Sequence, residues 1–101
     1  MDRPSRSALF VPGHRASWIE KAAGYGADTL ILDLEDSVPD QEKAAARGIT
    51  RAGIKTLKDN GQAAVNVRVN GFATGLTLDD LEGVLCPELD AIVLPKVETP
   101  A

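Results

Sequence analysis

Cysteine, histidine and aromatic residues are scarce in this chain of 101 residues, which has one cysteine, one histidine and four aromatic side chains. The single cysteine, Cys86, excludes an internal disulfide and a cluster of cysteine metal ligands, so we expect a reducing, cytoplasmic setting. With so few aromatic rings, the core must be mainly aliphatic. Such a composition is typical of parallel sheets, whose strands are covered on both faces.

Excess positive charge and long apolar runs are also lacking. The formal net charge of −4 argues against general binding to nucleic acid or to an anionic membrane. The first seven residues are mostly polar or charged, and no apolar run behind them is long enough for a signal peptide or a membrane span. We therefore expect a soluble protein that binds neither nucleic acid nor membranes. The length suits one small domain over residues 1–101.

Short apolar runs alternate with helical patterns along the whole chain. Apolar runs bounded by turn residues predict strands at residues 8–11, 29–34, 64–69 and 91–94. Helical spacing between them predicts helices at about residues 15–23, 39–60 and 77–85. Strict alternation of strand and helix predicts parallel strands joined by crossovers.

Two of the predicted helices carry start signals. Pro39 suits the first turn of the second helix, and Thr77 followed by Asp80 resembles a capping box that opens the third. The residues that should form one face of the second helix are Ala45, Ile49, Ala52 and Thr56.

Two α/β architectures fit this alternation: an open doubly wound sheet, or part of a (β/α)8 barrel. A complete barrel takes roughly 250 residues, so a chain of 101 residues supplies about the N-terminal half, with four strands. The sequence stops just after the fourth strand, where a covering helix should begin. We therefore expect a truncated TIM barrel whose C-terminal half is absent.

Polar or special residues stand at the end of each predicted strand. Ligands of parallel α/β folds bind at the carboxyl ends of strands, and charges beside apolar strands are costly unless paired or functional. The residues are Pro12, Gly13, His14 and Arg15 at the first strand, Asp33, Glu35 and Asp36 at the second, Arg68 and Asn70 at the third, and Lys96 and Glu98 at the fourth. Their convergence on one rim predicts an active site.

Carboxylates cluster at the second strand end. Asp33 and Glu35 should point to the same face, with Asp36 in the following loop, and such a group favours a hard cation such as Mg²⁺. Two structural alternatives stay open. Asp36 or Ser37 could cap the next helix, and Asp33 could be the buried partner of a lysine.

Arg68 lies between two valines of the third strand. Its planar guanidinium suits a carboxylate or a developing enolate oxygen, and the alternative is a structural salt bridge to one of the acids. Beyond the fourth strand, Lys96 and Glu98 fit a structural pair equally well.

The first strand end is basic. Residues 12–15, with Arg15 and Lys21 on the following helix, resemble an anion-binding turn, although no glycine-rich phosphate loop is present. His14 is expected to be an exposed loop residue, and Cys86 a small buried hydrophobic residue.

Four segments resemble the signatures of the citrate lyase beta subunits, malyl-CoA lyases and related enzymes of the HpcH/HpaI aldolase superfamily. They are RSALFVPGHR (6–15), ADTLILDLEDSV (27–38), VRVN (67–70) and LPKVE (94–98). Together they cover nearly the whole chain in order and with suitable spacing, which makes the resemblance highly specific.

The resemblance implies a TIM-type barrel that binds Mg²⁺, acts on CoA thioesters or 2-oxo acids, and forms homo-oligomers, as trimers or hexamers. Phe10, Arg15 and Lys21 match positions that hold the CoA nucleotide. Arg68 matches the arginine that engages the oxygens of the substrate, and Lys96 matches a lysine at the fourth strand end.

The resemblance also implies where the metal is held. Glu35 and Asp36 match an acidic pair that supports the water ligands of the metal. The direct ligands of the family lie on later strands, beyond Ala101, and Glu98 is not one of them. We therefore expect the chain as given to lack a complete catalytic centre and to be inactive alone.

The expected activity is that of a carbon–carbon lyase, by aldol or Claisen cleavage in which Mg²⁺ and Arg68 stabilise an enolate. One rival interpretation is a small doubly wound, receiver-like signalling domain that uses Asp33, Glu35 and Asp36 for Mg²⁺ and phosphorylation. Another is a non-catalytic barrel fragment, whose unpaired edges at the first and fourth strands would invite association.

Overall fold

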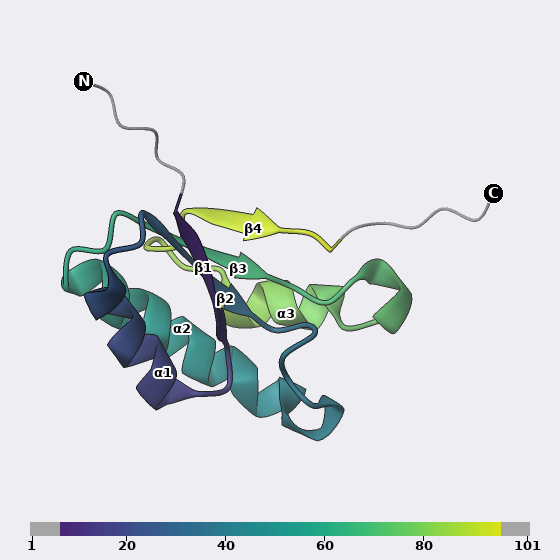
Figure 1. Ribbon diagram of the computed structural model, residues 1–101. Coiled ribbons are helices and arrows are strands. Elements are labelled where there is room, and N and C mark those ends of the chain that lie inside the picture. Colours follow the sequence, from purple (N-terminus) through teal and green to yellow (C-terminus); the bar gives the residue numbers. More distant parts are fainter. Residues whose placement is uncertain (1–6, 96–101) are drawn as a thin grey trace.

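The computed structural model describes residues 7–95, and in this range strands and helices alternate as the sequence predicts (Figure 1). The strands are β1 (Ala8–Pro12), β2 (Thr29–Asp33), β3 (Ala64–Arg68) and β4 (Ala91–Val93). The helices are α1 (Ala16–Ala22), α2 (Lys43–Asp59) and α3 (Thr77–Val84). Three short 3-10 turns complete the order, η1 (Ala23–Tyr25), η2 (Asp40–Glu42) and η3 (Phe72–Thr74). No helix between residues 7 and 95 is both long and apolar enough to cross a membrane.

The four strands form one parallel sheet in the order β1-β2-β3-β4. Strands that are consecutive in the chain are therefore neighbours in the sheet, and α1, α2 and α3 all lie on one side of it (Figure 1). A doubly wound sheet would need a reversal of strand order and helices on both faces. The receiver-like interpretation is therefore wrong, and the arrangement is that of a segment of a (β/α) barrel.

The core lies between the sheet and the helices, and it is aliphatic as expected. The register aligns Val11 with Leu32 and Leu32 with Val67, and all three are buried. The remaining buried members are Ile19, Ala22, Leu30, Leu34, Val38, Ala46, Ile54, Leu57, Val65, Val69 and Val84. Each large aliphatic side chain removed from water contributes about 1.5–3 kcal/mol. The four aromatic rings are instead exposed at the surface.

The buried face of α2 differs from the prediction. Ala45, Ala52 and Thr56 are exposed and Ile49 is only partly buried. The buried residues are Lys43, Ala46, Thr50, Gly53, Ile54 and Leu57. Both sets have helical spacing, but only the second contains two large aliphatic side chains in the core, and the apolar area they bury decides how the helix rotates.

The start of α2 also differs. The α-helix begins at Lys43, and Pro39 precedes a separate 3-10 turn, η2, instead of lying in the first turn of α2. Pro39 has an extended ψ of 148°, so the chain is not yet helical there. A proline just before a helical turn is common because its missing N–H needs no partner.

Candidate active site at the carboxyl ends of the strands

The strand register aligns Pro12, Asp33, Arg68 and Val93 in one row across the sheet. Each of them is the last residue of its strand. Because side chains alternate along a strand and the neighbouring row packs in the core, this row faces away from the helices. The sheet thus brings the second and third predicted strand ends together. The predicted residues at the fourth end, Lys96 and Glu98, lie outside the described residues.

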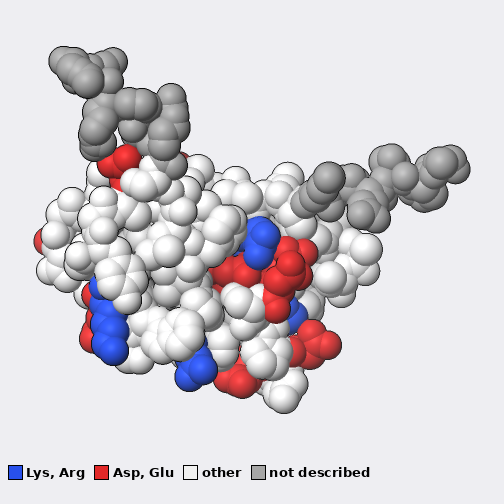
Figure 2. Space-filling view, in the orientation of Figure 1, with Lys and Arg blue, Asp and Glu red and all other residues white. Residues whose placement is uncertain are grey.

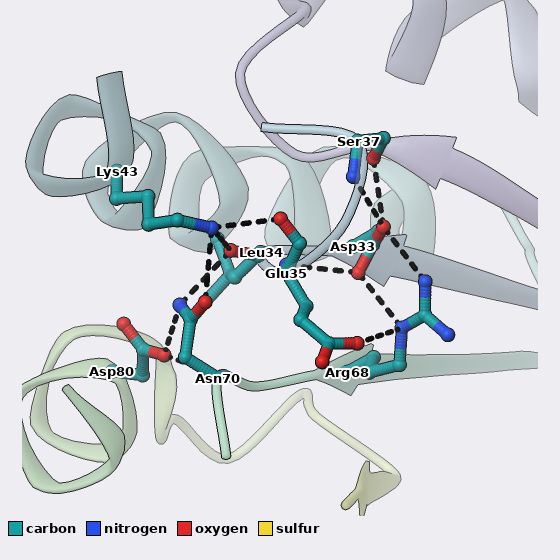
Figure 3. Close-up of polar contacts among 8 residues, drawn as sticks. All are labelled: Asp33, Leu34, Glu35, Ser37, Lys43, Arg68, Asn70 and Asp80. Atoms are coloured by element: carbon teal, nitrogen blue, oxygen red, sulfur yellow. Dashed lines mark hydrogen bonds and ion pairs between the residues drawn. The ribbon is translucent and has the colours of Figure 1, made fainter. Parts of the chain in front are cut away.

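Arg68 and Asp33 form a bidentate ion pair between β3 and β2 (Figure 3). Nε donates to Oδ1 and Nη2 donates to Oδ2 of Asp33, both at 2.9 Å. Glu35 Oε1 lies 3.4 Å from the same Nε. The salt bridge to the acids of this rim, which was the alternative role for Arg68, is therefore present. The partner of Asp33 is this arginine, so the prediction of a lysine partner is wrong.

Asp33 is also the anchor of the loop that follows β2. Its carboxylate accepts hydrogen bonds from the Glu35 amide, at 2.9 Å, and from the amide and hydroxyl of Ser37, at 3.1 and 2.8 Å. Ser37 therefore donates its hydroxyl to Asp33 and does not cap a helix, and neither does Asp36: η2 and α2 begin without a side-chain cap. The proposed capping role of Asp36 or Ser37 is wrong.

These contacts change the acid strength of both partners. Burial alone would raise the pKa of Asp33, but the hydrogen bonds from Arg68, Glu35 and Ser37 outweigh it and lower the pKa from its usual 3.8 to about 2. The hydrogen bond to Asp33 raises the pKa of Arg68 despite partial burial. The pair therefore stays fully charged at any pH at which the protein would work.

Two other acids of the rim have carboxylate oxygens that no side chain of residues 7–95 occupies. Glu35 is partly buried with one oxygen near Arg68, and Asp36 is exposed. Figure 2 shows acidic side chains gathered around a basic one near the carboxyl ends of β2 and β3. Within residues 7–95, no three histidine, cysteine, aspartate or glutamate side chains are placed to hold a metal ion together.

A groove runs along β1 beside α1, with a volume of about 370 Å³. Its lining includes Lys21 and three exposed aromatic side chains, Phe10, Trp18 and Tyr25. Arg15 stacks over Trp18, with its Cζ 4.9 Å from the ring centre. The three residues predicted to hold a nucleotide thus lie on or beside one groove.

Phe10 connects this groove to the ion pair. The Cζ atom of Arg68 lies 4.7 Å from the centre of the Phe10 ring, an arrangement in which the aromatic face attracts the cation. Trp18 and Tyr25 were not among the predicted site residues. The sequence could have indicated both, because they are two of only four aromatic residues and they flank Lys21 on a short helix and its 3-10 extension.

Asn70 and Asp80 join the loop after β3 to α3 (Figure 3). The Asp80 carboxylate is buried and accepts from the backbone and side-chain nitrogens of Asn70, at 2.8 and 2.7 Å. Its other oxygen accepts from Arg47 Nε at 2.9 Å. Thr77 donates to the Asn70 carbonyl. The predicted capping box is therefore wrong, because both of its members bind Asn70 or Arg47 instead of free helix amides.

Two further predictions concern single side chains. His14 is partly buried, not exposed as expected, and its Nδ1 is buried with no hydrogen-bond partner among the described residues. Cys86 is only partly buried and packs at the margin of the core.

Strands in sequential order, with helices on one side and an arginine–carboxylate cluster at their carboxyl ends, define a segment of a (β/α) barrel. The chain belongs to the HpcH/HpaI aldolase/citrate lyase family, which it matches over residues 6–101. The expected family is thereby confirmed.

Three relatives show which proteins the chain is similar to. It is 42% identical over 98 residues to a (3S)-malyl-CoA thioesterase of Cereibacter sphaeroides (ATCC 17029), which covers 97% of this chain and 34% of that protein. It is 37% identical to citrate lyase subunit beta of Leuconostoc mesenteroides subsp. cremoris, over 99% and 33% of the two chains. It is 43% identical to an L-malyl-CoA/beta-methylmalyl-CoA lyase of Cereibacter sphaeroides (ATCC 17025), over 94% and 30%.

Two solved structures share the fold. RipC from Yersinia pestis matches with a TM-score of 0.64 and 32% identity, over 93% of this chain and 35% of that one. CitE from Mycobacterium tuberculosis, in complex with magnesium, acetoacetate and coenzyme A, matches with a TM-score of 0.63 and 28% identity, over 95% and 35%. The chain thus spans about a third of the length of the relatives it matches.

Proposed function

We propose that this chain is the N-terminal part of a carbon–carbon lyase of the citrate lyase beta/malyl-CoA lyase type. The complete barrel would cleave an acyl-CoA or a related 2-oxo acid substrate by aldol or Claisen chemistry. The observation that carries the proposal is the Asp33–Arg68–Glu35 cluster at the carboxyl ends of β2 and β3, in a chain that belongs to this family.

Arg68 has donors to spare for a substrate. A guanidinium has five N–H donors, and Asp33 takes one on Nε and one on Nη2. The two donors on Nη1 and the second on Nη2 form an edge that can bind a carboxylate or an enolate oxygen with two parallel hydrogen bonds. Because Asp33 already fixes the guanidinium plane, little reorganisation is needed when negative charge develops on that oxygen.

We propose that the complete protein binds magnesium, because the structure of CitE, to which this chain is similar, contains it. Within the described part of the chain, Glu35 and Asp36 keep carboxylate oxygens without a partner, which suits the support of water ligands around a hard cation. The bound ion would polarise the substrate carbonyl. Since the described residues do not form a complete metal site, we propose that the direct ligands come from the rest of the barrel and that this chain is inactive alone.

The groove along β1 is our candidate for the CoA part of the substrate. Its aromatic faces suit the adenine ring, and the cations of Lys21 and Arg15 suit phosphates. Three expectations stay predictions. They are a role for Lys96 at the fourth strand end, a cytoplasmic location, and assembly into trimers or hexamers.

The variant Arg68→Lys tests the catalytic role in the intact protein. Lysine keeps the charge beside Asp33 but loses the planar fork, so we expect kcat/KM for cleavage of malyl-CoA to fall on the order of 100-fold to 1000-fold. Alanine is the poorer choice, because it would leave a buried carboxylate unpaired. The measurement is the appearance of the released 2-oxo acid.

Arg51→Lys is the matched control, because Arg51 is exposed on α2, and its turnover should be unchanged. Full activity of Arg68→Lys would remove Arg68 from the mechanism. An unmodified protein that releases free CoA thiol without a 2-oxo acid would be a thioesterase, as one relative is named, and the lyase proposal would fail.

A further inference from the structure

Lys43, the first residue of α2, is a buried cation that the cluster described above does not include. Its side-chain ammonium donates to the carbonyl oxygens of Leu34 and Glu35, at 3.0 and 2.7 Å, and to Oδ1 of Asn70 at 2.9 Å (Figure 3). These three bonds use all three of its donors. Among the described residues, no carboxylate lies within ion-pairing distance of it.

This placement is costly in two ways. Burying an ammonium without a paired carboxylate is expensive, and a cation in the first turn of a helix opposes the helix dipole. Arg47, one turn further along α2, adds a second cation at the unfavourable i,i+4 spacing. A residue that breaks several local rules while its ammonium binds the loop after β2 points to a role at the site.

The contacts of Lys43 define that role, because they act on the peptide groups around Glu35. Asp33 accepts the amide N–H of Glu35, and Lys43 binds the carbonyl of the same residue. Both sides of Glu35 are therefore fixed, one by the carboxylate that also orients Arg68 and the other by the buried ammonium.

Asn70 connects these contacts to the loop after β3. It accepts from Lys43 and donates through Nδ2 to the Leu34 carbonyl and to Asp80, both within 2.9 Å. Arg47 binds the second oxygen of Asp80. The loops after β2 and β3 are therefore locked to α2 and α3 through one buried polar network.

We propose that Lys43 is a positioning residue that fixes the backbone of residues 34–37 and thereby sets the Glu35 carboxylate against Arg68. Its effect on turnover rests on the proposed lyase function, whereas its effect on the loop does not. The two can therefore be tested separately.

Amide hydrogen exchange of the intact protein tests the loop. In Lys43→Met, the amides of Glu35 and Ser37 should exchange at least about tenfold faster, because the Asp33 bonds that protect them open locally. Exchange in the core of β2 and β3 should change much less. Lys43→Arg keeps a cation with several donors, and should restore most of the protection.

Lys58→Met is the matched control. The Lys58 ammonium also binds a carbonyl, that of Ala63, together with the Asp90 carboxylate, but away from Glu35. This variant should leave the Glu35 and Ser37 amides unchanged. Equal acceleration of all amides in Lys43→Met would show that Lys43 only contributes to global stability, and would overturn the proposal. If Lys43→Met does not fold, Lys43→Arg separates a positioning role from a contribution to global stability. A positioning role requires near-normal protection of the Glu35 and Ser37 amides in the arginine variant.

Kinetics of the same variants test the consequence. We expect Lys43→Met to lower kcat at least tenfold with little change in KM for the CoA thioester, because Lys43 lies outside the β1 groove. If the loop opens in Lys43→Met but the unmodified intact protein releases no 2-oxo acid, the proposed function fails and the positioning of Glu35 stands. If Arg68→Lys loses turnover while Lys43→Met keeps both turnover and protection, the positioning role fails alone.

Discussion

The role of Asp33 in the structure differs from the role that its neighbours in the sequence suggested. Three acids within four residues favoured a hard cation such as Mg²⁺, and a structural pairing of Asp33 was the alternative. In the structure, Asp33 is 2% exposed and is saturated by hydrogen bonds from Arg68, Glu35 and Ser37. Its role is to hold the arginine and the loop, which leaves Glu35 and Asp36 for a ligand. Spacing in the chain could not separate these roles, because the distinction depends on which acid the neighbouring strand aligns with Arg68.

The pH dependence of stability should report this role. The pKa of Asp33 is about 2 in the folded protein, against a usual 3.8, so the unfolded chain binds the proton more readily. The stability that Asp33 provides is present above about pH 4 and is lost as the pH falls towards 2. At about 1.4 kcal/mol for each pKa unit, we expect a loss on the order of 2 kcal/mol in the free energy of unfolding. Urea denaturation at a series of pH values measures it.

The variants Asp33→Asn and Asp36→Asn separate Asp33 from the other acids. Asp36 is a neighbouring, exposed aspartate, so its variant should keep nearly the whole acid-dependent loss. Asp33→Asn should be less stable at neutral pH, because Arg68 loses its partner, and should show a smaller loss between pH 4 and 2. An unchanged pH profile in Asp33→Asn would contradict the assignment.

At the scale of secondary-structure elements, the strands were predicted well and the buried face of α2 was not. The four apolar runs match β1 to β4 within one or two residues, because buried parallel strands need continuous aliphatic residues. The helix α2 carries two stripes with the same spacing, and only packing against the sheet selects the one with Ile54 and Leu57. Lys43 was missed for the same reason, since a lysine at a helix start normally predicts an exposed side chain.

The capping box at the start of α3 failed for a related reason. Thr77 and Asp80 have the spacing of a cap, but a buried asparagine outside the helix, Asn70, competes for both side chains. Such a competitor comes from another strand end, so a local pattern cannot reveal it. The convergence of the second and third strand ends was predicted, whereas the polar network beneath them required the structure.

The turn between β1 and α1 requires glycine for close packing. A Cβ atom at Gly13 would lie 2.5 Å from Thr50 Oγ1 and 2.7 Å from the Asp33 carbonyl oxygen. Gly13→Ala should therefore push this turn away from α2 and β2, break the bonds that Gly13 makes to both, and lower the free energy of unfolding by about 1–3 kcal/mol. Thermal or urea denaturation measures the change.

Gly48→Ala is the matched control for that substitution. Gly48 lies in α2, and an added Cβ there would meet nothing within 4 Å. Because alanine is the better helix former, this variant should be more stable by up to about 1 kcal/mol. Equal effects of the two substitutions would show that the close approach at Gly13 does not limit stability.

At the scale of the whole molecule, parallel strands bring residues that are far apart in the sequence together in one candidate site. Residues 12, 33, 68 and 93 are far apart in the chain and form one row, because each ends a strand of the same sheet. The row lies on the face opposite the helices, so the core and the site do not compete for the same side chains. Substitutions in the core should therefore change stability, while substitutions in the row should change both stability and ligand binding.

Leu32→Ala tests whether sheet and helices unfold as one unit. Leu32 is completely buried in the central strand β2, between Val11 and Val67, so the truncation should lower the free energy of unfolding by about 2–5 kcal/mol. Leu78→Ala is the control: Leu78 is 74% exposed on α3, and the change should stay within about 0.5 kcal/mol. Urea denaturation followed in parallel by far-ultraviolet circular dichroism and by Trp18 fluorescence should give coincident curves, because α1 packs on the same core as β2. Separate transitions in the two signals, or a cost below 1 kcal/mol for Leu32→Ala, would show that α1 and the sheet are not held together by this core.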